Sequence, residues 1–146
     1  SKTHILPKIE VAGSYVEQRV LCETRITFPG SHTYTVAVTH LDLTEANRLE
    51  QVPVINEILS KAAHPVIFGG DFNAQPGTQT INMIDAAGFV RSCKHNCFSI
   101  PSNKPTSEID FVTFRPSAKF TVVSNQVITG VTVSDHLPVI SILEMK

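Results

Sequence analysis

The sequence predicts a mixed α/β fold in which one β-sheet carries helices packed on one of its faces. Short apolar runs, some alternating with polar residues and some continuous, are typical of strands, whereas two longer segments repeat apolar residues at helical spacing. One of these helical segments lies between two strand segments, the order of a strand–helix–strand unit. The 146 residues fit a single domain, and a charged fraction of 17%, below the roughly 25% of average proteins, favours an ordered core.

The first two predicted strands form a hairpin. Residues 20–28 alternate between two sides of the chain, one of which carries Val20, Cys22, Thr24, Ile26 and Phe28. The segment Pro29-Gly30-Ser31 predicts a turn into a second strand over residues 34–40, which ends at His40.

A helix is predicted over residues 43–63. Thr44 can cap its amino terminus, and its apolar side comprises Leu49, Val52, Ile55, Leu59 and Ala62. Pro53 removes a backbone hydrogen bond and crowds the preceding turn, so we expect a kink or two shorter helices.

The remaining elements continue the alternation of strands and helices. A buried strand over residues 66–68 follows the first helix, and a second helix over residues 78–87 begins at Thr78 and stops at Gly88. Beyond it the sequence predicts a loop over residues 91–106 and then three strands, at 109–114, 120–123 and 137–143.

The three cysteines, Cys22, Cys93 and Cys97, leave at least one thiol unpaired and do not make a disulfide framework. Cys93, His95 and Cys97 offer soft ligands within one short segment. A structural zinc site needs a fourth ligand, and no second pair stands at a fitting spacing, so we interpret these thiols as incidental to a loop.

The charge balance argues mildly against a long nucleic-acid-binding groove. A net charge of −1 and a pI near 6.6 lack the basic footprint of proteins that bind nucleic acid mainly through its phosphates. The sequence contains no apolar run long enough to span a membrane and no signal-peptide pattern. We therefore expect a soluble chain, with cytoplasmic and secreted locations both open.

Polar side chains gather where predicted strands end or begin. Asp71 and Asn73 follow the buried strand and the glycine pair Gly69-Gly70, while His40, Asp110 and the segment 134–136 flank other strands. Each alone is an ordinary turn or edge residue. Together they suggest one rim where carboxylates and imidazoles bind a divalent cation and move protons.

A serine-hydrolase triad at Ser134, Asp135 and His136 is not supported. Side chains of such a triad come from separated positions, whereas neighbours in an extended segment point apart. The sequence also lacks a Gly-x-Ser-x-Gly elbow.

Four ordered motifs, 38–42, 69–76, 107–112 and 133–139, carry a resemblance. They resemble the carboxyl-half motifs of the endonuclease/exonuclease/phosphatase superfamily, the deoxyribonuclease I-like group. The resemblance implies that residues 1–146 form the carboxyl-terminal portion of that domain, half or most of a deoxyribonuclease I-like α/β sandwich. It also implies hydrolysis of a phosphate ester with Mg²⁺ or Mn²⁺. Nuclease, sphingomyelinase and inositol phosphatase activities remain open alternatives.

The resemblance also implies roles for individual residues. Asp71 activates the attacking water, and His136, polarised by Asp110, stabilises a phosphoryl oxygen. His40 contacts the scissile phosphate, and Asn73 holds the phosphate or the metal. The implied metal ligands are Asp135, Asp71 and Asn73, and the implied phosphate-binding residues are Arg19, His40 and Asn73.

The superfamily's amino-terminal half, with its metal-binding glutamate, has no counterpart in these residues. An apolar sheet face is then left uncovered, which a monomer does not tolerate. We expect either a second chain that supplies the amino-terminal half or self-association through that face. The alternative function is a non-catalytic fragment that acts as a folded binding or assembly module.

Overall fold

The computed structural model describes residues 1–30 and 32–146. Its main sheet has six strands in the order β1-β2-β3-β4-β6-β5, and β7 and β8 form a separate antiparallel pair. Among the strand pairs of the described residues, β3 and β4 alone run parallel, and the helix α1 connects them. The elements are β1 (Lys2–Ile5), β2 (Val20–Phe28), β3 (His32–His40), α1 (Glu45–Ser60), β4 (Val66–Asp71), α2 (Gln79–Ala86), β5 (Val90–Arg91), β6 (Asp110–Arg115), the 3₁₀ turn η1 (Ser117–Lys119), β7 (Phe120–Val127) and β8 (Val139–Met145).

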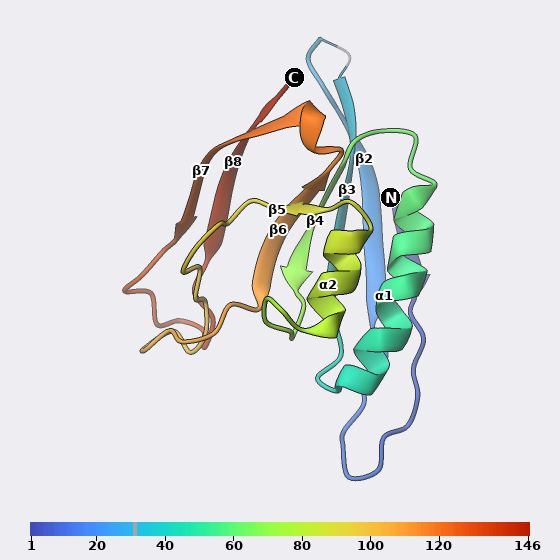
Figure 1. Ribbon diagram of the computed structural model, residues 1–146, viewed down its shortest axis with the longest axis vertical. Helices are drawn as coiled ribbons and strands as arrows, with labels where there is room; N and C mark the ends of the chain where they lie inside the picture. The colour runs from blue at the N-terminus through green and yellow to red at the C-terminus, as the bar shows by residue number, and fades with distance from the viewer. Residues whose placement is uncertain (31) are drawn as a thin grey trace.

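The two helices cover one face of the six-stranded sheet, as predicted, and the β7–β8 pair lies on the other side (Figure 1). Under the helices lies the main core, which includes Leu21, Ala37, Leu41, Val52, Ile55, Phe68, Phe72 and Phe111. A smaller cluster on the opposite face joins Tyr34 and Phe114 of the sheet to Phe120 at the start of β7. The mixed α/β fold predicted from the sequence is confirmed.

The predicted helices and strands are present, and their ends differ from the predicted ones by up to four residues. Thr44 caps α1 and Thr78 precedes α2, while Gly88 adopts a positive φ of 86° after α2. The sequence did not predict the short strands β1 and β5, and Ser31 of the predicted hairpin turn lies outside the described residues.

Of the two alternatives expected at Pro53, a kink or two shorter helices, the second is wrong, because α1 is one continuous helix. Pro53 is exposed, so water can hydrate the carbonyl group that its ring leaves without a partner. Its neighbours Val52 and Ile55 are fully buried and hold the helix against the sheet.

The interpretation of two thiols as incidental is also wrong, since Cys93 and Cys97 form a disulfide. Their Cα atoms lie 6.3 Å apart, and Cys22 stays free. The bond closes a short loop within the segment between β5 and β6, which is otherwise irregular, as predicted. Paired sulfurs leave no thiolates for zinc.

Apolar side chains remain exposed on the sheet face away from the helices. Val38 lies opposite Cys22 and Gly69 on that face and is 52% exposed. Ile5, Ile26 and Phe28 are also exposed, because the β7–β8 pair covers only the part of this face that includes Tyr34 and Phe114. Among the described residues, no helix is both long and apolar enough to cross a membrane.

Candidate active site

The register of three neighbouring strands brings His40, Asp71 and Asp110 together. His40, the last residue of β3, pairs with Asp71, the last residue of β4, and Asp71 pairs with Asp110, the first residue of β6. Paired residues of adjacent strands project from the same face. All three side chains therefore lie on the face away from the helices, at the carboxyl end of the parallel pair.

Two glycines in β4 allow its neighbours to approach closely at this end. Gly70 has a φ of +138°, and a Cβ added there would collide with the carbonyl oxygen of Thr39. A Cβ at Gly69 would lie 2.6 Å from the carbonyl oxygen of Phe111 on the other side. The absence of side chains at this glycine pair, next to Asp71, thus lets β3 and β6 lie close to β4.

His136 completes the cluster from the loop that leads into β8. Its Nδ1 donates to Asp110 Oδ2 at 2.8 Å, and its Nε2 lies 3.8 Å from Asp71 Oδ2. The same Asp71 oxygen is 3.4 Å from His40 Nε2. One carboxylate oxygen thus faces two imidazoles, while Asp110 orients one of them.

Burial and neighbouring charge change the acidity of these groups. Burial is the main cause that raises the pKa of Asp71, and Asp110 raises it further, against the opposing hydrogen bond from Asn73 and the two imidazoles. Burial by itself lowers the pKa of His136, but the hydrogen bond and charge of Asp110, with Asp71 and Asp135, leave it raised. His136 is therefore favoured as an imidazolium beside a carboxylate that accepts protons more readily than usual.

Asn73 lies beside Asp71 and supports the loop. Its backbone N–H donates to Asp71 Oδ1 at 2.8 Å, and its side-chain amide donates to the Leu41 carbonyl at 2.9 Å. The residue adopts a positive φ of 48°, which asparagine tolerates better than most residues. In this structure Asn73 therefore joins the end of β4 to the chain that follows β3.

The structure places the two remaining predicted site residues outside the cluster. Asp135 is exposed, and its backbone carbonyl accepts a hydrogen bond from Ser102. Arg19 pairs with Glu17 at 3.0 Å, and within residues 1–30 and 32–146 it has no ion pair or hydrogen bond with His40, Asp71 or His136.

Three side chains form a group that can hold a cation. Ligand atoms of Asp71, Asp110 and His136 all lie within 4.8 Å of one another. Two facing carboxylates, one with a raised pKa, make a site that a positive charge would stabilise. The donor set fits part of a divalent-metal site, since Mg²⁺ takes about six ligands and usually keeps several waters.

Two supporting residues were not predicted from the sequence. Buried Arg48 of α1 donates from Nη1 to the carbonyls of Asp42 and Leu43, and thereby holds the chain just beyond His40. Ser99, in the predicted loop, donates to Asp110 Oδ2. The sequence pattern did not predict either of these contacts.

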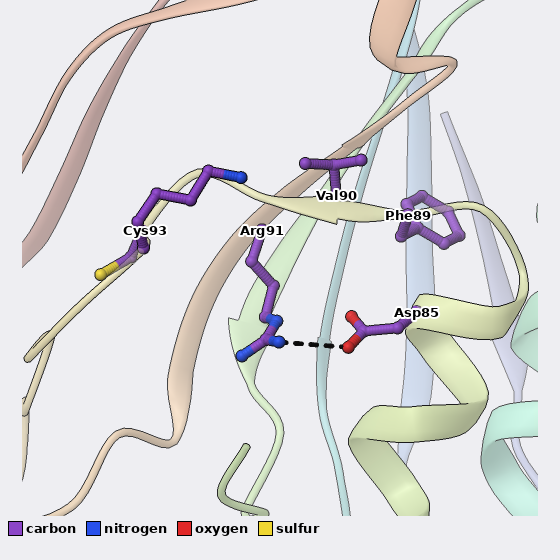
Figure 2. A pocket seen from close by; sticks show the side chains of 6 residues that line it. Asp85, Phe89, Val90, Arg91 and Cys93 are labelled. Atoms are coloured by element: carbon purple, nitrogen blue, oxygen red, sulfur yellow. Dashed lines mark hydrogen bonds and ion pairs between the residues drawn. The ribbon is translucent and has the colours of Figure 1, made fainter. Parts of the chain in front are cut away.

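A separate cavity of about 260 Å³ lies beside β5, away from this cluster. Figure 2 shows its Arg91 and Asp85 side chains pointing toward each other, in an ion pair of 3.2 Å, near Cys93. The ion pair neutralises the charges of Asp85 and Arg91, and Lys94 also lines the cavity.

No protein-family model matches the sequence, and no curated protein matches it. The fold matches solved structures. An endonuclease/exonuclease/phosphatase of Bacteroides vulgatus has a TM-score of 0.83 at 18% identity, over 99% of this chain and 64% of that one. A mannosyl-6-phosphatase of Bacteroides thetaiotaomicron has a TM-score of 0.74 at 22% identity, over 88% and 58%. The human Nocturnin catalytic domain, with a bound sulfate anion, has a TM-score of 0.73 at 16% identity, over 99% and 58%.

These structures confirm the predicted fold. The chain has the α/β fold of endonuclease/exonuclease/phosphatase structures, and it spans less than two thirds of the length of the three structures named above.

Proposed function

We propose that this chain is the carboxyl-terminal portion of a metal-dependent phosphate-ester hydrolase. The observation that carries the proposal is the convergence of His40, Asp71, Asp110 and His136 at one end of the sheet. The fold neighbours support it, since one is a mannosyl-6-phosphatase and another holds a sulfate, an anion of the size and shape of phosphate.

Asp71 is the residue that we assign to the water. In-line attack on phosphorus needs an oriented water that loses a proton, and a carboxylate with a raised pKa is a better acceptor than an ordinary one. This role is supported by the position of Asp71 Oδ2, which lies within 4 Å of both the His40 and the His136 imidazoles.

His136 and His40 are the residues that we assign to the phosphoryl oxygens. Asp110 binds His136 through Nδ1, which leaves Nε2 directed toward Asp71 and free to donate to an anion. His40 Nε2 lies 3.4 Å from the same Asp71 oxygen. We also assign Asn73 and Arg19 to phosphate binding. The imidazolium supplies positive charge where negative charge increases in the transition state.

We propose Mg²⁺ or Mn²⁺ as the cofactor, held by Asp71 and Asn73 together with Asp135. When bound, the ion supplies charge that neutralises the phosphoryl group. The carboxylate of Asp135 is exposed and can turn, whereas its backbone is fixed through Ser102.

The exposed apolar face of the sheet is the basis for the partner that we propose. Val38, Ile5 and Ile26 are exposed on the same face as the site, and the solved structures named above are longer than this chain. We propose that a further α/β layer covers this face, either an amino-terminal half or a second copy of the chain.

A second candidate is a folded module without catalysis. The three clustered donors favour it, because they alone do not complete a Mg²⁺ shell. Titration calorimetry with MgCl₂ separates the candidates: the hydrolase predicts saturable binding that Asp71→Asn weakens, and the module predicts only weak binding.

Hydrolysis of bis(4-nitrophenyl) phosphate and 4-nitrophenyl phosphate, with MgCl₂ or MnCl₂ and with chelator, tests the proposed reaction. We expect metal-dependent turnover that falls by roughly 10²–10⁴-fold in Asp71→Asn, the usual value of a positioned acid or base. Asp85→Asn is the matched control, since Asp85 pairs with Arg91 beside another cavity. Equal activity of Asp71→Asn and the native chain would exclude the role of Asp71.

A further inference from the structure

Ser99 connects the two residues that form the proposed Asp110–His136 pair. It is fully buried in the segment between β5 and β6. Its Oγ donates to Asp110 Oδ2 at 2.5 Å, the same oxygen that accepts from His136 Nδ1. One carboxylate oxygen thus receives two donors, one from each side.

The backbone of Ser99 contacts the same two regions. Its N–H donates to the carbonyl of Ser107, three residues before Asp110, and its carbonyl accepts from Leu137, the residue after His136, at 2.7 Å. All three polar groups of Ser99 therefore join the chain segments that carry Asp110 and His136.

The next turn of the same segment strengthens this connection. Ser102 donates from its backbone N–H to the carbonyl of Asp135 at 2.8 Å and from its Oγ to the carbonyl of Ser134 at 2.6 Å. The loop that carries His136 is therefore hydrogen-bonded to this segment at Ser134, Asp135 and Leu137, on both sides of His136. Only the bond from Ser99 Oγ reaches a side chain of the site.

We propose that Ser99 is a positioning residue that holds the Asp110 carboxylate in the orientation from which it binds His136. A carboxylate with one hydrogen-bonded partner can rotate about its side-chain bonds, whereas two donors on one oxygen restrict it. Misplacing a catalytic group by about 1 Å can cost 10²-fold in rate. The effect on turnover rests on the proposed hydrolase function, but the effect on the Asp110–His136 bond does not.

Proton NMR tests the bond without any need for turnover. An imidazole Nδ1–H that donates to a carboxylate gives a resonance far downfield, which Asp110→Asn identifies by its loss. We expect Ser99→Ala to weaken this resonance or move it upfield. An unchanged resonance in a folded Ser99→Ala protein would overturn the proposal.

Ser92→Ala is the matched control for a general effect of a lost buried hydroxyl. Ser92 is a buried serine of the same segment, and its Oγ bonds with Ser141 and Asn125 rather than with Asp110. We expect this control to keep the His136 resonance. If both variants lost it equally, the role of Ser99 would be general support of the loop and the proposal would fail.

Kinetics on bis(4-nitrophenyl) phosphate give the second readout. We expect Ser99→Ala to lower kcat by roughly ten- to a hundredfold with KM nearly unchanged. In the Asp110→Asn background the same change should have no further effect, because Ser99 acts through Asp110. A full effect of Ser99→Ala in that background would contradict the proposal. If the native chain shows no turnover, the proposed function fails while the NMR test still decides the role of Ser99.

Discussion

Asp71 and Asp110 stand directly opposite each other on the neighbouring strands β4 and β6. Like charges at opposed positions of a strand pair destabilise a sheet. Here the two carboxylates are also partly buried, with side-chain exposures of 16% and 20%. The pair of carboxylates destabilises the folded protein, and the neighbouring imidazoles of His40 and His136 offset part of this destabilisation.

The first prediction concerns the destabilisation caused by the Asp71–Asp110 pair. The pKa of Asp71 is raised above its ordinary value of 3.8, so the folded protein binds that proton more tightly than the unfolded chain does. Stability contributed by Asp71 therefore decreases as the pH rises from about 4 through the raised pKa. At pH 7 we expect Asp71→Asn to raise the melting temperature, since opposed pairs are worth on the order of 0.2–1 kcal/mol.

Calorimetric melting with and without MgCl₂ measures this effect. Magnesium should raise the melting temperature of the native chain, because it binds the folded state, and should raise that of Asp71→Asn by less. A variant that melts below the native protein at pH 7 would contradict the prediction.

The second prediction concerns His136. Its pKa is raised because Asp110 and the other carboxylates outweigh burial, which acts in the opposite direction. We expect Asp110→Asn to lower the pKa of His136, as followed by NMR titration of its ring protons. The protonated His136 stabilises the folded protein fully at a pH below the pKa of the unfolded chain. This stabilisation disappears as the pH rises through the higher pKa of His136 in the folded protein. Asp110→Asn should therefore lose stability mainly at acidic pH. Asp85→Asn should leave the titration unchanged, and a pKa in Asp110→Asn equal to the native one would refute the assignment.

The third prediction concerns the backbone next to Asp71. Gly70→Ala should unfold the protein or destabilise it by more than about 4 kcal/mol, since the new methyl group would meet the Thr39 carbonyl. Gly77→Ala is the control, because Gly77 also has a positive φ but nothing lies within 4 Å of an added Cβ. It should cost only about 1–2 kcal/mol in urea unfolding. Similar losses in both variants would show that backbone conformation, and not the close approach of β3, determines the effect.

The fourth prediction concerns the exposed sheet face. If a second copy can cover it, the isolated 16.0 kDa chain should elute as a dimer in size-exclusion chromatography with light scattering, and Val38→Lys should return it to a monomer. Val133→Lys is the control, since Val133 is 92% exposed and lies outside the strands. A native chain that stays monomeric would leave the amino-terminal half as the proposed partner.

Local sequence patterns predicted most of the fold because strand and helix periods are local properties. The strand that ends at Asp71, the hairpin that ends at His40 and the helix between them could all be located this way. The meeting of His40 and Asp71 followed from the rule that parallel strands end at one edge.

What the sequence did not show depends on contacts between distant segments. Strand β1 has only four residues and exists because it pairs with β2. In the sequence Ser99 looks like any loop serine, and its hydrogen bonds with Asp110 and Leu137 form only in the folded structure. The continuity of α1 at Pro53 likewise depends on burial of its neighbours, which overrides the local preference.

The alternation of side chains along β4 has a consequence for how this protein tolerates change. Phe68 points into the core beneath the helices, and Asp71 points to the other face, where the site lies. Neighbouring residues of this strand therefore meet different requirements, core packing on one face and the chemistry of the site on the other. In a saturation-mutagenesis screen that scores cellular abundance and turnover separately, the two scores should diverge with a period of two residues along this strand.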